Sequence, residues 1–158
     1  MTQYERMVKG LVYDPGDPEI MNEQVPFMDK QWGFNQLKPS DYEKKQEYMR
    51  EVFAECGENC YIELPLRANW GGRHLHLGSG IYINTGFTLV DDGHIYVGDK
   101  VMFGPNVIIT TANHPEDQSR APERAAARAV RQVPVAEAAL EASQAPGRVS
   151  TKRPARYR

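Results

Sequence analysis

The chain has 158 residues, of which 41% are hydrophobic and 25% charged, and its formal net charge is −2. These values are ordinary for a globular protein of one domain. No apolar run approaches the roughly 20 residues of a membrane span, and the opening residues MTQYERMVKG lack the form of a signal peptide. We therefore expect a cytoplasmic protein without a membrane partner. In that setting Cys56 and Cys60 are expected to be free thiols.

The charge and the composition change abruptly after residue 114. Residues 1–114 carry 10 Lys and Arg against 16 Asp and Glu, whereas residues 115–158 carry 9 against 5. The later segment holds 11 of the 14 Ala and 8 of the 12 Arg, and it contains no Ile, Phe, Trp, Met, Asn or His. The two parts are therefore interpreted separately.

Residues 1–57 are expected to form a helical cap. Thr2 and Glu5 have the spacing of a capping box, which predicts a short first helix. Asp17, followed by a proline, has the form of a second helix start. Pro26 lies inside that helix and is expected to divide it into two pieces.

A third helix is predicted between a capping box at Ser40 and Glu43 and a terminator at Gly57. Its apolar face would consist of Tyr42, Met49, Val52, Phe53 and Cys56, and its solvent face of Lys44, Lys45, Glu47 and Glu51. Such a helix would cover the first coil of the segment that follows.

Residues 58–114 contain a six-residue repeat. Two apolar series interleave, with a two-residue slip at 91–93: Leu77, Ile83, Leu89, Val97, Phe103 and Ile109, and Leu75, Ile81, Phe87, Ile95, Val101 and Val107. A period of six fits neither a helix nor an isolated strand, and it is typical of a parallel β-helix. Gly, Asn and Asp tolerate the positive φ angles of tight corners, which are expected at residues 78–80, 84–86, 91–93, 98–100 and 104–106.

The Ala- and Arg-rich segment 115–158 does not resume this repeat. Stretches 125–131 and 136–142 have high helix propensity, but prolines interrupt them and large apolar residues are scarce. We expect disorder or irregular helix here. The basic end, 151–158, is interpreted as a solvated tail rather than a nucleic-acid contact.

His114 is the histidine best placed for chemistry. It closes a polar run after the last apolar strand, and an imidazole titrates near neutral pH, so it is one candidate general base. His74 and His76 lie two apart on a predicted strand, but no third ligand is near, so no metal site is expected. His94 follows a corner and is expected to be exposed.

Asn84 and Asp92 both fall at predicted corners. Asn and Asp suit such positions by backbone preference alone. Alternatively, the two side chains lie on one side of the solenoid and face a ligand. The residues by themselves leave both interpretations open.

Several motifs together resemble one known family, the maltose and galactoside O-acetyltransferases of the hexapeptide-repeat class. They are Gly10–Asp14, Arg67–Gly71, Tyr82–Asn84, Val90–Asp92, Gly104–Val107 and Thr111–Pro115. The resemblance implies a mainly β fold, with a left-handed parallel β-helix behind the helical cap, and a homotrimer. It also implies transfer of acetyl from acetyl-coenzyme A to a hydroxyl of a sugar such as maltose, glucose or a galactoside.

The resemblance also assigns roles by motif. His114 matches the catalytic histidine, which takes the proton of the acceptor hydroxyl. Asn84 matches a residue at the junction of acceptor and acetyl donor, and so contacts both. Asp14, Asn69 and Asp92 match positions that contact the acceptor.

This resemblance covers residues 1–114. Beyond them the family continues with further coils that supply much of the coenzyme A site, whereas this chain continues with its Ala- and Arg-rich segment. One hypothesis is a frameshift near residue 115, which the other two reading frames of the gene would reveal. The alternative function is therefore an inactive, truncated fragment that keeps only acceptor binding or oligomer contacts. Because residues 75–109 make only about two coils, weak stability and aggregation are expected.

Overall fold

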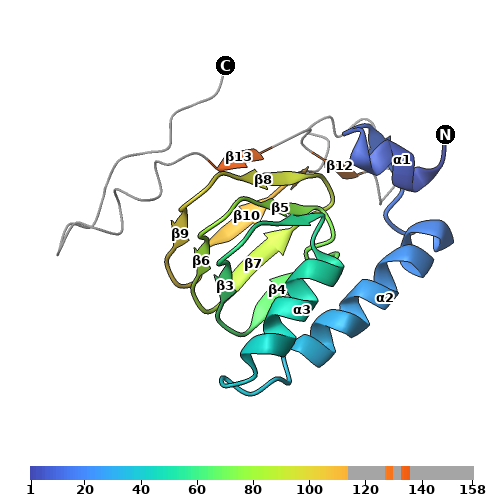
Figure 1. The fold of residues 1–158 in the computed structure, drawn as a ribbon. Coiled ribbons are helices and arrows are strands. Elements are labelled where there is room, and N and C mark those ends of the chain that lie inside the picture. Colours follow the sequence, from blue (N-terminus) through green and yellow to red (C-terminus); the bar gives the residue numbers. More distant parts are fainter. Residues whose placement is uncertain (114–126, 130–132, 136–158) are drawn as a thin grey trace.

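The computed structural model describes residues 1–113, 127–129 and 133–135 (Figure 1). Helices near the N-terminus lie beside a stack of strands that winds into a β-helix (Figure 1). The helices are α1 (Gln3–Val8), α2 (Pro18–Phe34) and α3 (Tyr42–Val52). The strands are β1 (Val12–Tyr13), β2 (Glu55–Cys56), β3 (Tyr61–Ile62), β4 (Leu66–Ala68), β5 (Leu75–Leu77), β6 (Tyr82–Ile83), β7 (Phe87–Val90), β8 (Ile95–Val97), β9 (Met102–Phe103), β10 (Ile108–Thr110), β11 (Ala112–Asn113), β12 (Ala127–Ala129) and β13 (Val133–Val135).

Three parallel sheets form the faces of the solenoid. Their strand orders are β10-β7-β4, β13-β8-β5-β2 and β3-β6-β9. Each coil contributes one strand to each face, so β2 to β4, β5 to β7 and β8 to β10 form three successive coils. The predicted parallel solenoid is therefore confirmed. Residues 75–109 make two of these coils, as predicted, and residues 55–68 form a complete coil before them.

The two predicted apolar series line the interior. Eleven of the twelve side chains are buried, and Val107 is partly buried against the same core. Along each strand, residues of these series alternate with residues that point outward, because successive side chains of a strand point to opposite faces. Trp70 instead belongs to a second cluster with Met7, Tyr13 and Ile20, which joins the N-terminal elements to the solenoid.

One corner illustrates the expected turn chemistry. Gly86 and Asn106 stack in successive coils with φ angles of 74° and 58°. The Asn106 amide donates to the Thr85 carbonyl at 2.9 Å, and a Cβ on Gly86 would lie 2.3 Å from Asn106 Oδ1. Glycine at position 86 is thus required both by its backbone conformation and by the close approach of the next coil.

The first two helix starts follow the prediction. Thr2 and Glu5 form the reciprocal capping box, and the Asp17 carboxylate accepts the Glu19 amide at 2.9 Å. The predicted break at Pro26 is wrong, because α2 runs unbroken from Pro18 to Phe34. A proline inside a helix loses one backbone hydrogen bond.

Contacts with the solenoid hold the C-terminal part of α2 in place. The Asn35 side chain donates to the Leu66 carbonyl at 2.7 Å and accepts the Leu66 amide at 2.9 Å. The Gln31 side chain accepts the Ala68 amide at 2.6 Å. These bonds tie the end of the helix to β4, and they offset the local cost of Pro26.

The third helix differs from its prediction at both ends. It is preceded by Asp41 rather than Ser40, and the Asp41 carboxylate accepts the Lys38 amide instead of capping the helix. The predicted capping box at Ser40 is therefore wrong. The helix ends at Val52, and Cys56 lies on strand β2 instead of on the helix.

Lys45 was expected on the solvent face of α3, and this expectation is also wrong. The buried residues Lys45, Tyr48, Met49 and Val52 follow the i, i+3, i+4, i+7 spacing of one helix face. Lys45 is 1% exposed, and its Nζ has no hydrogen-bond partner among the described residues. The ammonium lies 5.1 Å from the centroid of the Tyr61 ring, a cation–π contact.

The described residues of the later segment are strands. Strand β13 pairs in parallel with β8, with Val133 opposite Ile95, and β12 pairs antiparallel with both β1 and β11. The expectation of disorder or helix is wrong for these six residues. An open coil edge presents unpaired backbone groups, which an added strand satisfies. The rest of the predicted tail, and His114 with it, lies outside the described residues.

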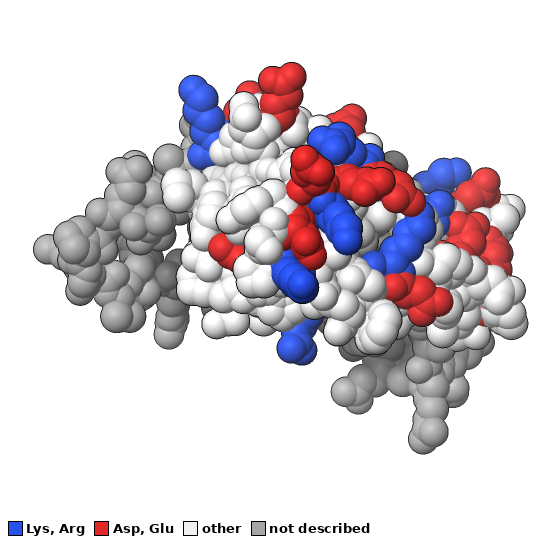
Figure 2. Space-filling model, turned by 60° about the horizontal axis from the view of Figure 1, so that its bottom comes forward, with Lys and Arg blue, Asp and Glu red and all other residues white. Residues whose placement is uncertain are grey.

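The outer surface carries charges of both signs. On the face shown in Figure 2, Lys and Arg side chains lie interspersed with Asp and Glu. Lys30 and Glu51 form an ion pair between α2 and α3 at 2.6 Å. In the described part of the chain, no helix has both the length and the apolar character needed to cross a bilayer.

We predict that Lys45→Met stabilises the protein. The substitution replaces a buried ammonium that lacks a hydrogen bond with an apolar side chain of similar length, and we expect the free energy of unfolding to rise by about 1 kcal/mol. Chemical denaturation monitored by circular dichroism measures this change. Lys44→Met, at the exposed neighbouring position, is the matched control and should change stability by no more than about 0.5 kcal/mol. A destabilised Lys45→Met would contradict the prediction.

Candidate functional site

Three hydrogen-bond donors converge on the carboxylate of Asp92, at the corner that follows β7. Tyr13 donates its hydroxyl to Oδ2 at 2.7 Å. The Asn69 side-chain amide and the Trp70 indole both donate to Oδ1 at 3.2 Å. Asp92 is 6% exposed. The structure thus brings the predicted site residues Asn69 and Asp92 into direct contact, and it adds Tyr13 and Trp70.

Asp91, the preceding residue, is wholly buried and holds the adjacent coil in place. Its two carboxylate oxygens accept the backbone amides of Trp70 and Gly72 at 2.8 and 3.0 Å. Burial raises the pKa of Asp91 to about 7, although these two hydrogen bonds act in the opposite direction. Trp70 is therefore fixed at its backbone by Asp91 while its indole binds Asp92.

His74 contacts the backbone of the same corner. Its Nδ1 contacts the Asp91 carbonyl at 2.5 Å, and its Nε2 contacts the Tyr4 hydroxyl at 2.8 Å. Because a carbonyl only accepts, Nδ1 carries the hydrogen and Nε2 accepts from Tyr4. Burial lowers the pKa of His74 to about 4, which keeps the ring neutral.

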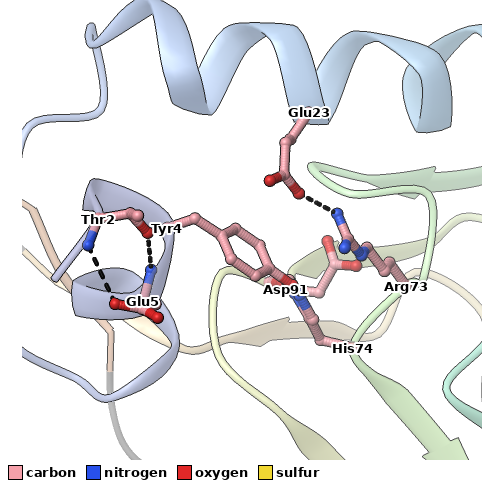
Figure 3. Close-up of polar contacts among 7 residues, drawn as sticks. All are labelled: Thr2, Tyr4, Glu5, Glu23, Arg73, His74 and Asp91. Carbon is pink, nitrogen blue, oxygen red and sulfur yellow. Dashed lines mark hydrogen bonds and ion pairs between the residues drawn. The ribbon is translucent and has the colours of Figure 1, made fainter.

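The first helix contacts His74, and the second contacts its neighbour Arg73. Figure 3 shows Tyr4 reaching from α1 to His74, with the Arg73–Glu23 ion pair of 2.9 Å beside it. The Cζ atom of Arg73 also lies 4.8 Å from the centroid of the Tyr4 ring and 4.7 Å from the centroid of the Phe27 ring. The N-terminal cap is therefore part of the framework of the site.

Asp14 lies beside this corner but makes local contacts. Its carboxylate accepts the Gly16 amide at 2.8 Å, and its own amide donates to the Gln3 side chain at 2.9 Å. The neighbouring residue, Tyr13, is the one that reaches Asp92. Sequence reasoning missed Tyr13 and Trp70, although each adjoins a residue that the family resemblance had singled out.

Asn84 belongs to a different corner. Its side-chain oxygen accepts the Thr85 amide at 2.8 Å, and Thr85 donates its hydroxyl to the Leu64 carbonyl at 2.6 Å. Strand β7 separates Asn84 from Asp92, and a strand of four residues spans roughly 13 Å. Within one chain the structure does not bring Asn84 and Asp92 together, so the two do not face a ligand from one shared corner.

The residues that lead to His114 are held against the Asp92 corner. The Thr111 hydroxyl accepts the Gly93 amide at 2.8 Å and donates to the Val90 carbonyl at 2.7 Å. Strand β11 continues from there to Asn113. His114 itself lies outside the described residues, so its predicted role stays a prediction.

The other two described histidines contact each other, and His94 also packs edge-on against His74, with 5.1 Å between the ring centroids. His76 Nε2 lies 2.8 Å from His94 Nδ1, and the Glu55 carboxylate lies 3.1 Å from His76 Nδ1. His94 is half-buried, which corrects the expectation that it is exposed. Among residues 1–113, 127–129 and 133–135, no group of three or more His, Cys, Asp or Glu side chains could hold a metal ion.

The two cysteines are free thiols, as predicted. Burial raises the pKa of Cys56 to about 12, with the neighbouring Cys60 thiol acting in the same direction. The thiolate is the reactive form of cysteine, so this thiol is a poor nucleophile at neutral pH.

Comparison with known proteins identifies the family. Residues 6–57 match the maltose acetyltransferase hexapeptide capping motif. The galactoside O-acetyltransferase of Lactococcus lactis subsp. lactis is 44% identical over 115 residues, which are 73% of this chain and 56% of that protein. The crystal structure of a maltose O-acetyltransferase from Clostridium difficile 630 aligns with a TM-score of 0.77 and 28% identity, over 85% of this chain and 69% of that one. The chain belongs to the maltose and galactoside O-acetyltransferase family.

The extent of the match differs between sequence and structure. The galactoside O-acetyltransferase of Escherichia coli (strain K12) is 38% identical over 82 residues, 52% of this chain and 40% of that protein. The chain thus spans about half the length of these curated relatives. The structural match covers 85% of the chain, whereas the match to the Lactococcus lactis protein covers 73%, close to the extent of residues 1–114.

We predict that His74 makes stability depend on pH. Its folded pKa of about 4 lies below the ordinary 6.5, so its contribution is lost as the pH falls from 6.5 toward 4. Asp91 acts in the opposite sense: its contribution is fully present below pH 3.8 and is lost as the pH rises to about 7. His74→Gln removes only the first contribution.

Melting midpoints measured between pH 6.5 and 4 test this prediction. As the pH falls from 6.5 to 4, we expect the melting midpoint of His74→Gln to decrease less, or to increase more, than the melting midpoint of the wild-type protein. Nitrogen NMR of the imidazole rings measures the titration of His74 directly. A titration near pH 6.5, or equal pH dependence in the two proteins, would show that His74 has no such role.

Proposed function

We propose that this protein transfers acetyl from acetyl-coenzyme A to a hydroxyl of a sugar of the maltose, glucose or galactoside type. One observation carries the proposal: Asn69 and Asp92 meet at a buried corner, and the strand that leads to His114 is bound to the same corner. The family of the chain supports the chemistry. A related hexapeptide-repeat acetyltransferase from Vibrio cholerae, solved with acetyl-coenzyme A, aligns with a TM-score of 0.69 and 25% identity over 85% of this chain and 69% of that one.

The corner residues would bind and orient the acceptor. Carboxylate and amide oxygens accept hydrogen bonds from sugar hydroxyls, and Asp92 and Asn69 supply both types. Asp14, on the exposed turn after Tyr13, would contribute a further carboxylate. Buried donors restrict how Asp92 can turn, so a hydroxyl bound there would be held in one orientation.

His114 would act as the general base. Its ring nitrogen would take the proton of the acceptor hydroxyl as that oxygen attacks the thioester carbonyl. A carbon–oxygen bond forms and the carbon–sulfur bond breaks, and the proton passes to the departing thiolate of coenzyme A. This sequence needs no metal ion, because the attacking oxygen is activated by the imidazole.

A homotrimer is part of the proposal. Asn84, assigned to the junction of acceptor and acetyl donor, lies away from Asp92 within one chain. A neighbouring subunit would bring the two kinds of corner together. Large apolar side chains on the outer surface of the solenoid offer contact area, with Ile108 70% and Met102 44% exposed. We further propose a cytoplasmic location and no nucleic-acid or membrane partner.

The second candidate is a non-catalytic fragment that retains acceptor binding or oligomer contacts. The observation that favours it is composition, because after residue 114 the chain continues with an Ala- and Arg-rich segment that does not resume the six-residue repeat. By resemblance, much of the coenzyme A site is supplied by later coils. Acceptor binding without turnover would be the property of such a fragment.

We predict that the purified chain releases thiol from acetyl-coenzyme A when maltose, glucose or a galactoside is present, and that His114→Ala lowers the rate by about 10²- to 10⁴-fold. A thiol-reactive dye measures the release. His76→Ala is the matched control, because its ring contacts Glu55 and Tyr96 rather than the Asp92 corner, and the rate of this variant should stay near that of the wild-type protein. No release from folded, soluble protein would favour the fragment.

A further inference from the structure

We infer that Tyr13 is a positioning residue for Asp92 and that, with Asn69 and Trp70, it leaves this carboxylate one open hydrogen-bond position, which accepts a single hydroxyl of the acceptor. The inference rests on the proposed function and goes beyond it. The inference specifies that Asp92 binds one acceptor hydroxyl. It also specifies that Tyr13 determines which carboxylate oxygen of Asp92 binds that hydroxyl.

The number of donors limits what Asp92 can still accept. A carboxylate offers about four lone-pair positions, two on each oxygen. Asn69 and Trp70 occupy both positions of Oδ1, at 3.2 Å each, and Tyr13 occupies one position of Oδ2 at 2.7 Å. As far as the described residues contact this carboxylate, one position on Oδ2 remains open. Since Asp92 is 6% exposed, a ligand reaches only a small part of this side chain.

Tyr13 can fill this role because it is itself fixed. It is 4% exposed and packs in the cluster with Met7, Ile20 and Trp70. Burial, together with the charge of Asp92, raises the pKa of Tyr13, so the phenol keeps its hydrogen and donates it. Its bond to Asp92 is the shortest of the three.

Backbone pairing links the strand of Tyr13 to the strand that leads to His114. Strand β1 pairs with β12, and β12 pairs with β11, so that Val12 and Asn113 lie opposite the same residue, Arg128. Asn113 directly precedes His114. The strand that carries Tyr13 and the strand that leads to His114 therefore belong to one sheet, which fixes Tyr13 relative to the residues on both sides.

The test compares two tyrosine-to-phenylalanine variants. Tyr13→Phe removes the hydroxyl that contacts Asp92 and keeps the ring. Tyr48→Phe is the matched control: Tyr48 is also buried, at 8% exposure, and its hydroxyl donates to the Gly71 carbonyl at 2.8 Å. Both variants lose one buried hydrogen bond of similar length, but only the first loses a bond to Asp92.

Calorimetry and saturation-transfer NMR measure binding of methyl glucoside, methyl galactoside and their monodeoxy analogues. We expect Tyr13→Phe to bind the parent sugar about tenfold more weakly, and Tyr48→Phe to remain within about twofold of the wild-type protein. The loss should disappear for the one analogue that lacks the hydroxyl bound by Asp92. Where turnover is measurable, KM for the sugar should rise while KM for acetyl-coenzyme A stays unchanged.

The possible failures are distinguishable. If the wild-type protein neither binds nor acetylates any of these sugars, the proposed function is wrong and the inference is overturned with it. If the wild-type protein binds and Tyr13→Phe binds equally well, only the inference is overturned.

A second comparison does not depend on the folding of Tyr13→Phe. Asp92→Asn and the wild-type protein are compared over the same monodeoxy series. If a single deoxy position abolishes the difference between them, one open position on Asp92 is supported. If two positions each abolish part of it, Asp92 binds more than one hydroxyl and the inference is overturned.

Discussion

The parallel stacking of coils is the constraint on which the rest of the structure depends. Backbone amides of one coil donate to carbonyls of the next, and the apolar series points inward as a consequence. The same register superimposes the corners. The backbone N–H of Asn69 donates to the Leu89 carbonyl at 3.2 Å. This register places Asn69 and Trp70 directly against Asp91 and Asp92. The geometry of the candidate site is thus a result of coil stacking.

The corner concentrates buried polar groups, and their mutual hydrogen bonds make this possible. Asp91, Asp92 and His74 are each less than a tenth exposed. A buried polar network stabilises a unique arrangement only when its members are satisfied, and here partners come from α1, β1 and the preceding coil. The N-terminal cap therefore does more than cover the first coil, because it completes the shell around Asp92.

The end of the solenoid remains the part where family and chain differ. Strand β13 occupies the next position on the face formed by β8, so the backbone pattern continues for one strand beyond the third coil. The curated relatives are nearly twice as long as the segment they share with this chain. In the proposed function the donor half of the reaction would depend on elements other than the corner residues, and the proposed trimer would bring Asn84 of one subunit to Asp92 of another.

The sequence by itself determined the parallel solenoid, its inward residues, two helix caps and the family. Side-chain direction alternates along a strand and local caps involve residues close in sequence, so both are readable without contacts. Only the tertiary structure decided that Lys45 is buried, that α2 passes through Pro26, that residues 133–135 join the stack, and that Tyr13 and Trp70 bind Asp92. These outcomes depend on contacts between residues far apart in the chain, whose energies exceed the local preferences that a sequence reveals.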